Sequence, residues 1–209
     1  MILLFLLIDH FKTRVKMSSN RAYYILKFFV FQSRIWQFLR VLINWRCVKL
    51  DKDFINLAAR SLVWPVCLVG AIENEKHNIM TVAWITQISA NPLQLVISID
   101  KSRYTHNMIS ETGEFMVSIL SSEQKEIAAV CGSRSGRNVD KIKQLKIETV
   151  PSTVVKVPRL AGCLANMECK VVAQYPAGGR TLFVGEVVAA DVGKENLKPM
   201  IMYRGKYIG

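Results

Sequence analysis

The spacing of apolar residues changes along this chain, from a long apolar and basic stretch before residue 50 to short runs of strand length after it. Four such runs follow one another, separated by residues typical of turns. They are Trp64–Ile72, Asn78–Ile88, Leu93–Asp100 and Glu114–Leu120, with breaks at Asn74–Lys76, Asn91–Pro92 and Gly113. Two later runs, Asn166–Tyr175 and Thr181–Val192, flank Gly178–Gly179, a pair typical of a tight hairpin. Six strands with short turns favour a barrel or a sandwich.

Three short helices are predicted around these strands: Asp51–Ser61, His106–Thr112 and Ser121–Val130. Thr105 lies where it can cap the second helix. Ser121, with Gln124 three residues later, forms the pattern of a capping box at the start of the third. Residues 51–209 are therefore expected to form one mostly β domain with short helical insertions.

The net charge of +12 is concentrated at the N-terminal end. Residues 1–50 carry nine basic side chains and one acidic side chain, or +8, whereas residues 51–209 carry 19 basic and 15 acidic side chains, or +4. A nucleic-acid-binding domain would spread its cations over one folded surface. We therefore expect no nucleic-acid partner for the domain.

Residues 1–50 are expected to lie outside the domain. Met1–Ile8 is apolar but shorter than the ~20 residues that span a bilayer, and basic residues follow it instead of preceding it, unlike in a signal peptide. From Tyr23 to Trp45, polar and basic residues gather on one helical face, which is typical of an amphipathic helix on an anionic membrane. The alternative, which we favour, is a start assigned too far upstream, because the stretch lacks caps and turn residues. We expect no membrane contact by it.

The cysteines argue against a disulfide framework and against a metal site. There are five of them, at Cys47, Cys67, Cys131, Cys163 and Cys169, an odd number with no C-x-x-C pair. We expect reduced thiols in a cytoplasmic protein, and Cys67, inside an apolar run, is expected to fill the core.

Ser102–His106 follows the strand that ends at Asp100 and begins a predicted helix. The start of a helix offers unpaired N–H groups, and the forked guanidinium of Arg103 matches a phosphate. The segment is therefore a candidate phosphate site. An arginine and a capping threonine are also common at helix starts that bind nothing.

Two further segments carry candidate chemistry. Asn78–Trp84 places small and hydroxyl residues between bulky ones, which lets a flat ring approach the strand backbone; an ordinary core strand has the same pattern. Cys131–Lys141 is a polar and basic loop before another short helix. Such a loop alone is typical of a solvated surface.

Taken together and in this order, six segments resemble the flavin reductase-like FMN-binding split-barrel family, which contains flavoredoxin and the archaeal-type ferric reductases. They are Pro65–Gly70 (PVCLVG), Asn78–Trp84 (NIMTVAW), Ser102–Phe115 (SRYTHNMISETGEF), Cys131–Lys141 (CGSRSGRNVDK), Glu168–Val172 (ECKVV) and Thr181–Val188 (TLFVGEVV). The resemblance covers nearly all of residues 62–209 and none of residues 1–50.

The resemblance implies a split β-barrel and a homodimer that binds FMN near its interface. By the family pattern, Thr81, Val82, Ala83 and Trp84 line the isoalloxazine ring, Ser98 and Ile99 lie beside it, Arg103 and Thr105 hold the phosphate, and Lys141 reaches the ring from the second subunit. No side chain is expected to be catalytic, because the hydride chemistry takes place at flavin N5. No metal is expected.

Arg180 departs from the family pattern, in which many members have a histidine just before T-L-F-x-G-E. A guanidinium stays charged at any working pH and cannot replace the proton chemistry of an imidazole. Two functions fit the resemblance. The first is an oxidoreductase that passes electrons from NAD(P)H through FMN to a flavin, ferric iron or a protein. The second is a flavoredoxin-like carrier that exchanges electrons with protein partners without nicotinamide turnover.

Overall fold

The computed structural model describes residues 52–193 and 196–209, so the predictions for residues 1–50 and for Cys47 lie outside the described residues. Helix α3 (Lys52–Ala59) matches the predicted first helix and buries none of its residues. Residues Leu57–Gly209 form one compact unit. Within the described part of the chain, no helix is both long and apolar enough to cross a membrane.

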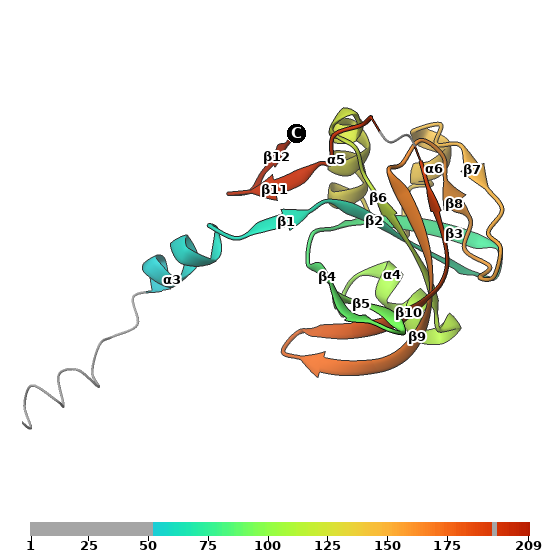
Figure 1. Ribbon diagram of the computed structural model, residues 1–209, viewed down its shortest axis with the longest axis horizontal. Helices are drawn as coiled ribbons and strands as arrows, with labels where there is room; N and C mark the ends of the chain where they lie inside the picture. The colour runs from blue at the N-terminus through green and yellow to red at the C-terminus, as the bar shows by residue number, and fades with distance from the viewer. Residues whose placement is uncertain (1–51, 194–195) are drawn as a thin grey trace, which may run out of the picture. The chain divides into compact units, whose positions relative to one another are not determined.

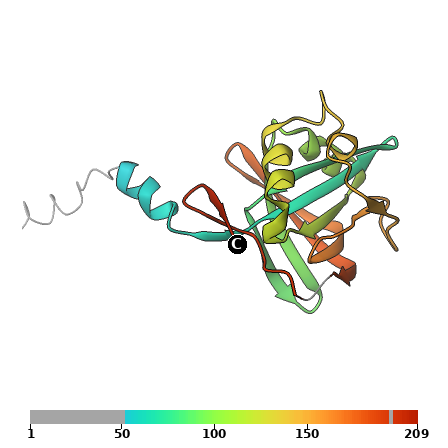
Figure 2. The ribbon, with the colours of Figure 1, turned by 90° about the horizontal axis from the view of Figure 1, so that it is seen from above.

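One antiparallel sheet of seven strands makes up most of the compact unit (Figure 1). Its strands, in spatial order, are β3 (Lys76–Val82), β2 (Cys67–Glu73), β6 (Glu114–Ile119), β9 (Ala165–Ala177), β10 (Arg180–Val192), β5 (Leu93–Asp100) and β4 (Ile85–Ala90). The longest pairing joins β9 to β10 through the two-residue turn Gly178–Gly179, as predicted, with Gly178 at a φ of 59°. Figures 1 and 2 show the sheet curling around its interior.

The curled sheet does not close. Its two edge strands, β3 and β4, follow each other in the chain and are joined only by Ala83–Trp84, yet they form no ladder with each other. The sheet is therefore a barrel split between β3 and β4. This confirms the predicted fold class, a mostly β split barrel with short helical insertions.

Shorter elements complete the unit. Strands β1 (Val63–Pro65), β11 (Ile201–Tyr203) and β12 (Lys206–Ile208) form a three-stranded sheet, and β7 (Thr149–Val150) pairs with β8 (Arg159–Leu160). The helical insertions are α4 (Tyr104–Thr112), the 3₁₀ turn η1 (Ser122–Gln124), α5 (Lys125–Ser133) and α6 (Lys141–Gln144).

Two predicted strands are each divided in the structure. Trp64–Ile72 separates into β1 and β2, because residues up to Pro65 pair with β11, whereas the strand from Cys67 on pairs with β3 and β6. Asn78–Ile88 separates into β3 and β4, which are the opposite edges of the sheet. Apolar continuity predicted each run correctly but not the change of pairing partner inside it.

The helix ends differ from the prediction in two places. Helix α4 begins at Tyr104 with Arg103 as its N-cap residue, so the expectation that Thr105 caps it is wrong: Thr105 is buried in the first turn and accepts a hydrogen bond from Asn78. The predicted capping box of Ser121 and Gln124 is confirmed. It opens a 3₁₀ turn, and α5 then continues through Gly132, which does not adopt a positive φ.

Strand β2 is buried on both faces. Cys67, Val69 and Ala71 point into the barrel, where they join Met108 and Ile109 of α4. Val66 and Leu68 point the other way, into a second cluster that includes Ala128 and Cys131 of α5. Alternation with a period of two thus fills two cores, one inside the sheet and one beneath α5. Cys67 is a core residue, as predicted, and the four cysteines in the described part of the chain are free and buried.

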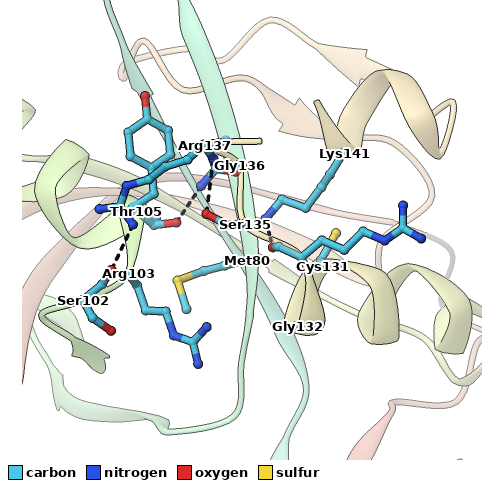
Figure 3. A pocket seen from close by; sticks show the side chains of 13 residues that line it. Met80, Ser102, Arg103, Thr105, Cys131, Gly132, Ser135, Gly136, Arg137 and Lys141 are labelled. Atoms are coloured by element: carbon cyan, nitrogen blue, oxygen red, sulfur yellow. Dashed lines mark hydrogen bonds between the residues drawn. The ribbon is translucent and has the colours of Figure 1, made fainter. Parts of the chain in front are cut away.

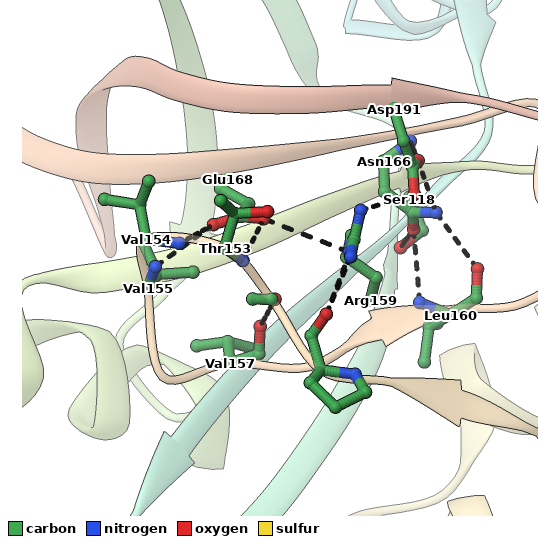
Figure 4. A network of polar contacts seen from close by, with 12 residues as sticks. Ser118, Thr153, Val154, Val155, Val157, Arg159, Leu160, Asn166, Glu168 and Asp191 are labelled. Carbon is green, nitrogen blue, oxygen red and sulfur yellow. Dashed lines mark hydrogen bonds and ion pairs between the residues drawn. The ribbon is translucent and has the colours of Figure 1, made fainter.

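A buried carboxylate, Glu168 of β9, holds the loop that precedes β8 against the sheet (Figure 4). Its two oxygens accept the backbone N–H groups of Thr153, Val154 and Val155 at 2.8, 2.7 and 3.1 Å. Nε of Arg159 lies 4.0 Å from Oε1. Burial raises the pKa of Glu168, but the three backbone donors and Arg159 outweigh it, so that the pKa lies below its usual value.

We expect Glu168→Gln to lower the free energy of unfolding by about 2–3 kcal/mol, because the amide NH₂ turns a donor toward backbone N–H groups that need an acceptor. The lowered pKa means that this stability is present at neutral pH and is lost as the pH falls below about 4.5. Urea titrations at pH 7 and pH 4 measure both effects. The exposed Glu148→Gln is the control, and an equal loss in the two variants would contradict the role of Glu168.

Candidate functional site

A polar cavity of about 160 Å³ lies where the first turn of α4 meets β3 and the segment that joins α5 to α6 (Figure 3). Its walls come from four parts of the chain: Asn78 and Met80 of β3; Ser102, Arg103, Tyr104 and Thr105 around the start of α4; Cys131, Gly132, Arg134, Ser135, Gly136 and Arg137 after the middle of α5; and Lys141 of α6. None of these residues carries a carboxylate, while four carry a cation. The cavity is therefore built for an anion.

The turn before α4 leaves the first N–H groups of the helix available. Asp100 accepts hydrogen bonds from the hydroxyl and backbone N–H of Ser102 at 2.7 and 2.9 Å, and these two bonds lower the pKa of Asp100. Arg103 then takes the N-cap position with extended backbone (φ −76°, ψ 139°) and makes no side-chain cap bond. The positive end of the helix dipole and the Arg103 side chain thus both lie at the cavity.

Thr105 is placed by β3. Nδ2 of the buried Asn78 donates to Oγ1 of Thr105 at 2.8 Å. Gly136 packs directly on the same amide, because a Cβ at this position would lie 2.1 Å from Oδ1 of Asn78. Strand β3, helix α4 and the 134–137 segment therefore meet at Asn78.

Lys141 contributes a buried cation. Its side chain is 3% exposed, and Nζ donates to the carbonyl oxygen of Arg134 at 3.2 Å. Burial lowers the pKa of Lys141, Cys131 raises it, and the guanidinium of Arg103 lowers it further. Lys141 lines the cavity of its own chain, together with Arg103 and Thr105. Its contact with a flavin bound to a second subunit stays a prediction. An ammonium buried without a carboxylate beside it is costly unless an anion binds there.

Arg137 and Tyr104 close one side of the cavity. Nη1 of Arg137 donates to the carbonyl oxygen of Ser102 at 3.1 Å, and its Cζ lies 5.4 Å from the centre of the Tyr104 ring. Nζ of Lys76 lies 5.0 Å from the centre of the same ring. These cation–π contacts hold two further positive charges near the helix start.

A second, shallower pocket of about 270 Å³ lies at the β3–β4 connection, lined by Trp64, Trp84, Ile85, Thr86, Val96, Ser98 and Leu182. The indole of Trp84 is 49% exposed there. Arg180 stacks on that indole, with Cζ 4.3 Å from the ring centre, and donates from Nε and Nη2 to Oγ and O of Ser98 at 2.8 and 2.7 Å. Its Nη1 lies 3.9 Å from Oδ2 of Asp100.

The structure thus divides the nine predicted site residues into three groups. Arg103, Thr105 and Lys141 line the polar cavity, and Trp84 and Ser98 line the shallow pocket. The remaining four, Thr81, Val82, Ala83 and Ile99, line neither: Val82 and Ile99 are buried in the core, Thr81 Oγ1 donates to Ala128 O at 2.6 Å, and Ala83 joins β3 to β4. These four can meet a ligand chiefly through their backbone.

The sequence analysis named the segments Asn78–Trp84 and Cys131–Lys141 but assigned no individual role to Asn78, Met80 or residues 135–137, which line the cavity. Asn78 and Met80 stand in the segment that carried the family resemblance, and a polar residue among apolar strand positions was the available sign. Nothing in the sequence around Gly136 indicates its role, because that role is a close approach to Asn78, 58 positions away in the chain. The described residues hold no group of three or more His, Cys, Asp or Glu side chains that could bind a metal ion.

Comparisons with known proteins agree with this geometry. The family described as "Flavin reductase like domain" matches residues 59–209. An uncharacterized protein of Archaeoglobus fulgidus is 39% identical over 132 residues, which cover 62% of this chain and 75% of the relative. A ferric-chelate reductase (NAD(P)H) of the same organism is 34% identical over 112 residues, covering 53% and 65%.

The likeness extends to solved structures. Flavoredoxin from Methanosarcina acetivorans superposes with a TM-score of 0.63 and 31% identity, over 70% of this chain and 84% of that one. The matched family covers the whole split barrel, including the polar cavity and the shallow pocket. The chain belongs to the flavin reductase-like domain family.

Proposed function

We propose that this protein binds FMN and passes electrons from NAD(P)H through the flavin to an acceptor that is a flavin, ferric iron or a protein. The observation that carries the proposal is the polar cavity, in which the buried ammonium of Lys141 and the start of α4 face no carboxylate. A phosphate monoester supplies the missing negative charge. A ligand without an anionic group would leave Lys141 uncompensated.

Three residues would hold the phosphate. Arg103 offers a forked donor at the mouth of the cavity, Thr105 a hydroxyl at its wall, and Lys141 a charge at its base. We assign Lys141 to the phosphate instead of the ring, because it shares one cavity with the other two. The cavity fits the phosphate of FMN in both charge and donor type.

The flavin ring would lie along Thr81–Trp84, with Ser98 and Ile99 beside it. Met80 lines the polar cavity and Trp84 the shallow pocket, and the four residue steps between them span at most about 14 Å. A ligand with a phosphate at one end and a flat ring at the other suits that separation. When bound, flavin supplies the hydride chemistry at N5, and the protein binds and orients it. We propose no catalytic side chain.

The site is further proposed to work in a homodimer. Val172 and Tyr175, on the β9–β10 hairpin, are 51% and 57% exposed. Apolar side chains gathered on one hairpin favour a protein partner.

A carrier function is the second candidate, favoured by the 31% identity to flavoredoxin. In that case the protein holds FMN and exchanges electrons with protein partners, without turnover on a nicotinamide.

We expect the purified protein to take up FMN and become yellow, and the colour to bleach within seconds on anaerobic addition of NADH or NADPH. Absorbance near 450 nm follows the reduction. A yellow protein that dithionite reduces but neither nicotinamide does would favour the carrier. A protein that stays colourless after incubation with FMN would overturn both functions.

We expect Lys141→Met to weaken FMN binding by about 10- to 100-fold, because one charge-assisted hydrogen bond is lost. Because the pKa of Lys141 is lowered, we also expect the FMN affinity of the unmodified protein to fall as the pH rises, at a lower pH than for a lysine of ordinary pKa. This alkaline fall is absent from the variant. Quenching of flavin fluorescence measures both.

Lys143→Met is the matched control, since Lys143 lies on the same helix with a side chain that is 87% exposed. An equal effect of the two substitutions would contradict a specific role for Lys141.

We expect Arg180→His to add a titration near pH 6.5 to the midpoint potential of the bound flavin, because an imidazole gains a proton there while a guanidinium stays charged. Asp100, 3.9 Å from Arg180, would raise the pKa of the new imidazole, and Arg103 would lower it. Potentials measured between pH 5 and pH 8 test this. The exposed Arg204→His, whose arginine also stacks on an aromatic ring, is the control. Unchanged pH dependence in Arg180→His would place Arg180 away from the ring.

A further inference from the structure

The hydrogen bond between Asn78 and Thr105 decides where the Thr105 proton can go. Nδ2 of Asn78 is a donor, so Oγ1 of Thr105 is the acceptor of that bond, at 2.8 Å. Both residues line the polar cavity and both are buried (Figure 3). With one lone pair of Oγ1 taken by Asn78, the hydroxyl proton is left to donate to whatever occupies the cavity.

The same arrangement recurs at Ser135. Its Oγ accepts the backbone N–H of Arg137 at 3.3 Å, which leaves its own proton to donate. Two backbone carbonyls next to the cavity are also already used: Ser102 O accepts from Arg137, and Arg134 O accepts from Lys141. These two carbonyl oxygens are thus bonded within the protein, while Thr105 and Ser135 each keep a proton to donate.

We propose that Asn78 is a specificity-determining positioning residue, which holds the Thr105 oxygen as an acceptor so that its proton points to the ligand, and so makes the cavity favour an ionised phosphate over a neutral hydroxyl group. The inference rests on the proposed flavin function and deepens it. An ionised phosphate only accepts hydrogen bonds, so each donor at the cavity finds an acceptor. A terminal hydroxyl, as in riboflavin, carries no charge to pair with the cations of the cavity and accepts fewer of these donors than a phosphate does.

Gly136 holds the Asn78 amide in this orientation. A Cβ at this position would lie 2.1 Å from Oδ1 and 2.5 Å from Cγ of Asn78. Any side chain here would push the amide away from Thr105. The glycine is needed for this close approach and not for a left-handed backbone, since its φ is not positive.

A double-mutant cycle on Asn78→Leu and Thr105→Val tests the proposal, with FMN and riboflavin as the two probes and fluorescence quenching as the measurement. We expect each single variant to weaken FMN binding by about tenfold, the effect of one lost hydrogen bond to a charged group, and to leave riboflavin binding nearly unchanged. The double variant is expected to bind FMN no more weakly than Thr105→Val alone, because Asn78 acts through that hydroxyl.

Asn78→Asp reverses the hydrogen bond without changing the shape of the side chain. Its carboxylate accepts from Thr105, so the hydroxyl no longer donates to the ligand. We expect it to weaken FMN binding more than Asn78→Leu does, again with little effect on riboflavin.

Gly136→Ala tests the orientation of the Asn78 amide by a second substitution. We expect it to weaken FMN binding in the unmodified protein and to have little further effect in an Asn78→Ala background, where the amide that it displaces is gone. Gly179→Ala, at a turn with nothing within 4 Å of the added Cβ, is the control.

Two results would overturn the inference: losses for FMN and riboflavin of equal size, which indicate a general structural role, or effects of Asn78→Leu and Thr105→Val that simply add. These outcomes differ from failure of the proposed function, in which the unmodified protein binds neither flavin.

Discussion

The unclosed edge of the sheet is the constraint on which the site depends. Strands β3 and β4 are neighbours in the chain but lie at opposite edges of the seven-stranded order, so the backbone between them, Ala83–Trp84, belongs to no ladder. Closing the barrel would pair this backbone and cover it. Left open, it exposes the indole of Trp84 and lets the start of α4 lie against β3. The shallow pocket lies at this connection, and the polar cavity lies against β3, the strand that leads into it.

The charge of Lys141 is only partly compensated within the protein. Lys141 is buried with the carbonyl oxygen of Arg134 as its hydrogen-bond partner, and burial lowers its pKa, so its charged form is costly and an anion in the cavity would stabilise it. Glu168, on the other side of the barrel, is the contrast: it is equally buried, but three N–H groups and Arg159 compensate its charge. The charge of Glu168 is thus compensated within the fold, whereas the charge of Lys141 could be compensated by a bound anion.

The sequence pattern correctly predicted the features that depend on residues close together in the chain. Alternating apolar residues located the strands, Gly178–Gly179 located the hairpin, and Ser121 with Gln124 located the capping box. It failed where a residue's partner is distant in the chain. Thr105 looked like a cap, because its true partner, Asn78, lies 27 positions earlier. The family resemblance supplied the site residues as a set, but only the folded chain shows that Lys141 shares its own cavity with Arg103 and Thr105.

Arg180 can fix geometry and positive charge but cannot release a proton, whereas a histidine could do both. Arg180 pairs with Asp100 at the start of β10. Its guanidinium bonds Ser98 on β5 and stacks on Trp84, so it links β5 and β10 to the β3–β4 connection. An imidazole is too short to make a forked bond to both Oγ and O of Ser98 while covering the indole, but it can carry a proton. The guanidinium is therefore suited to fixing the geometry and positive charge of the shallow pocket.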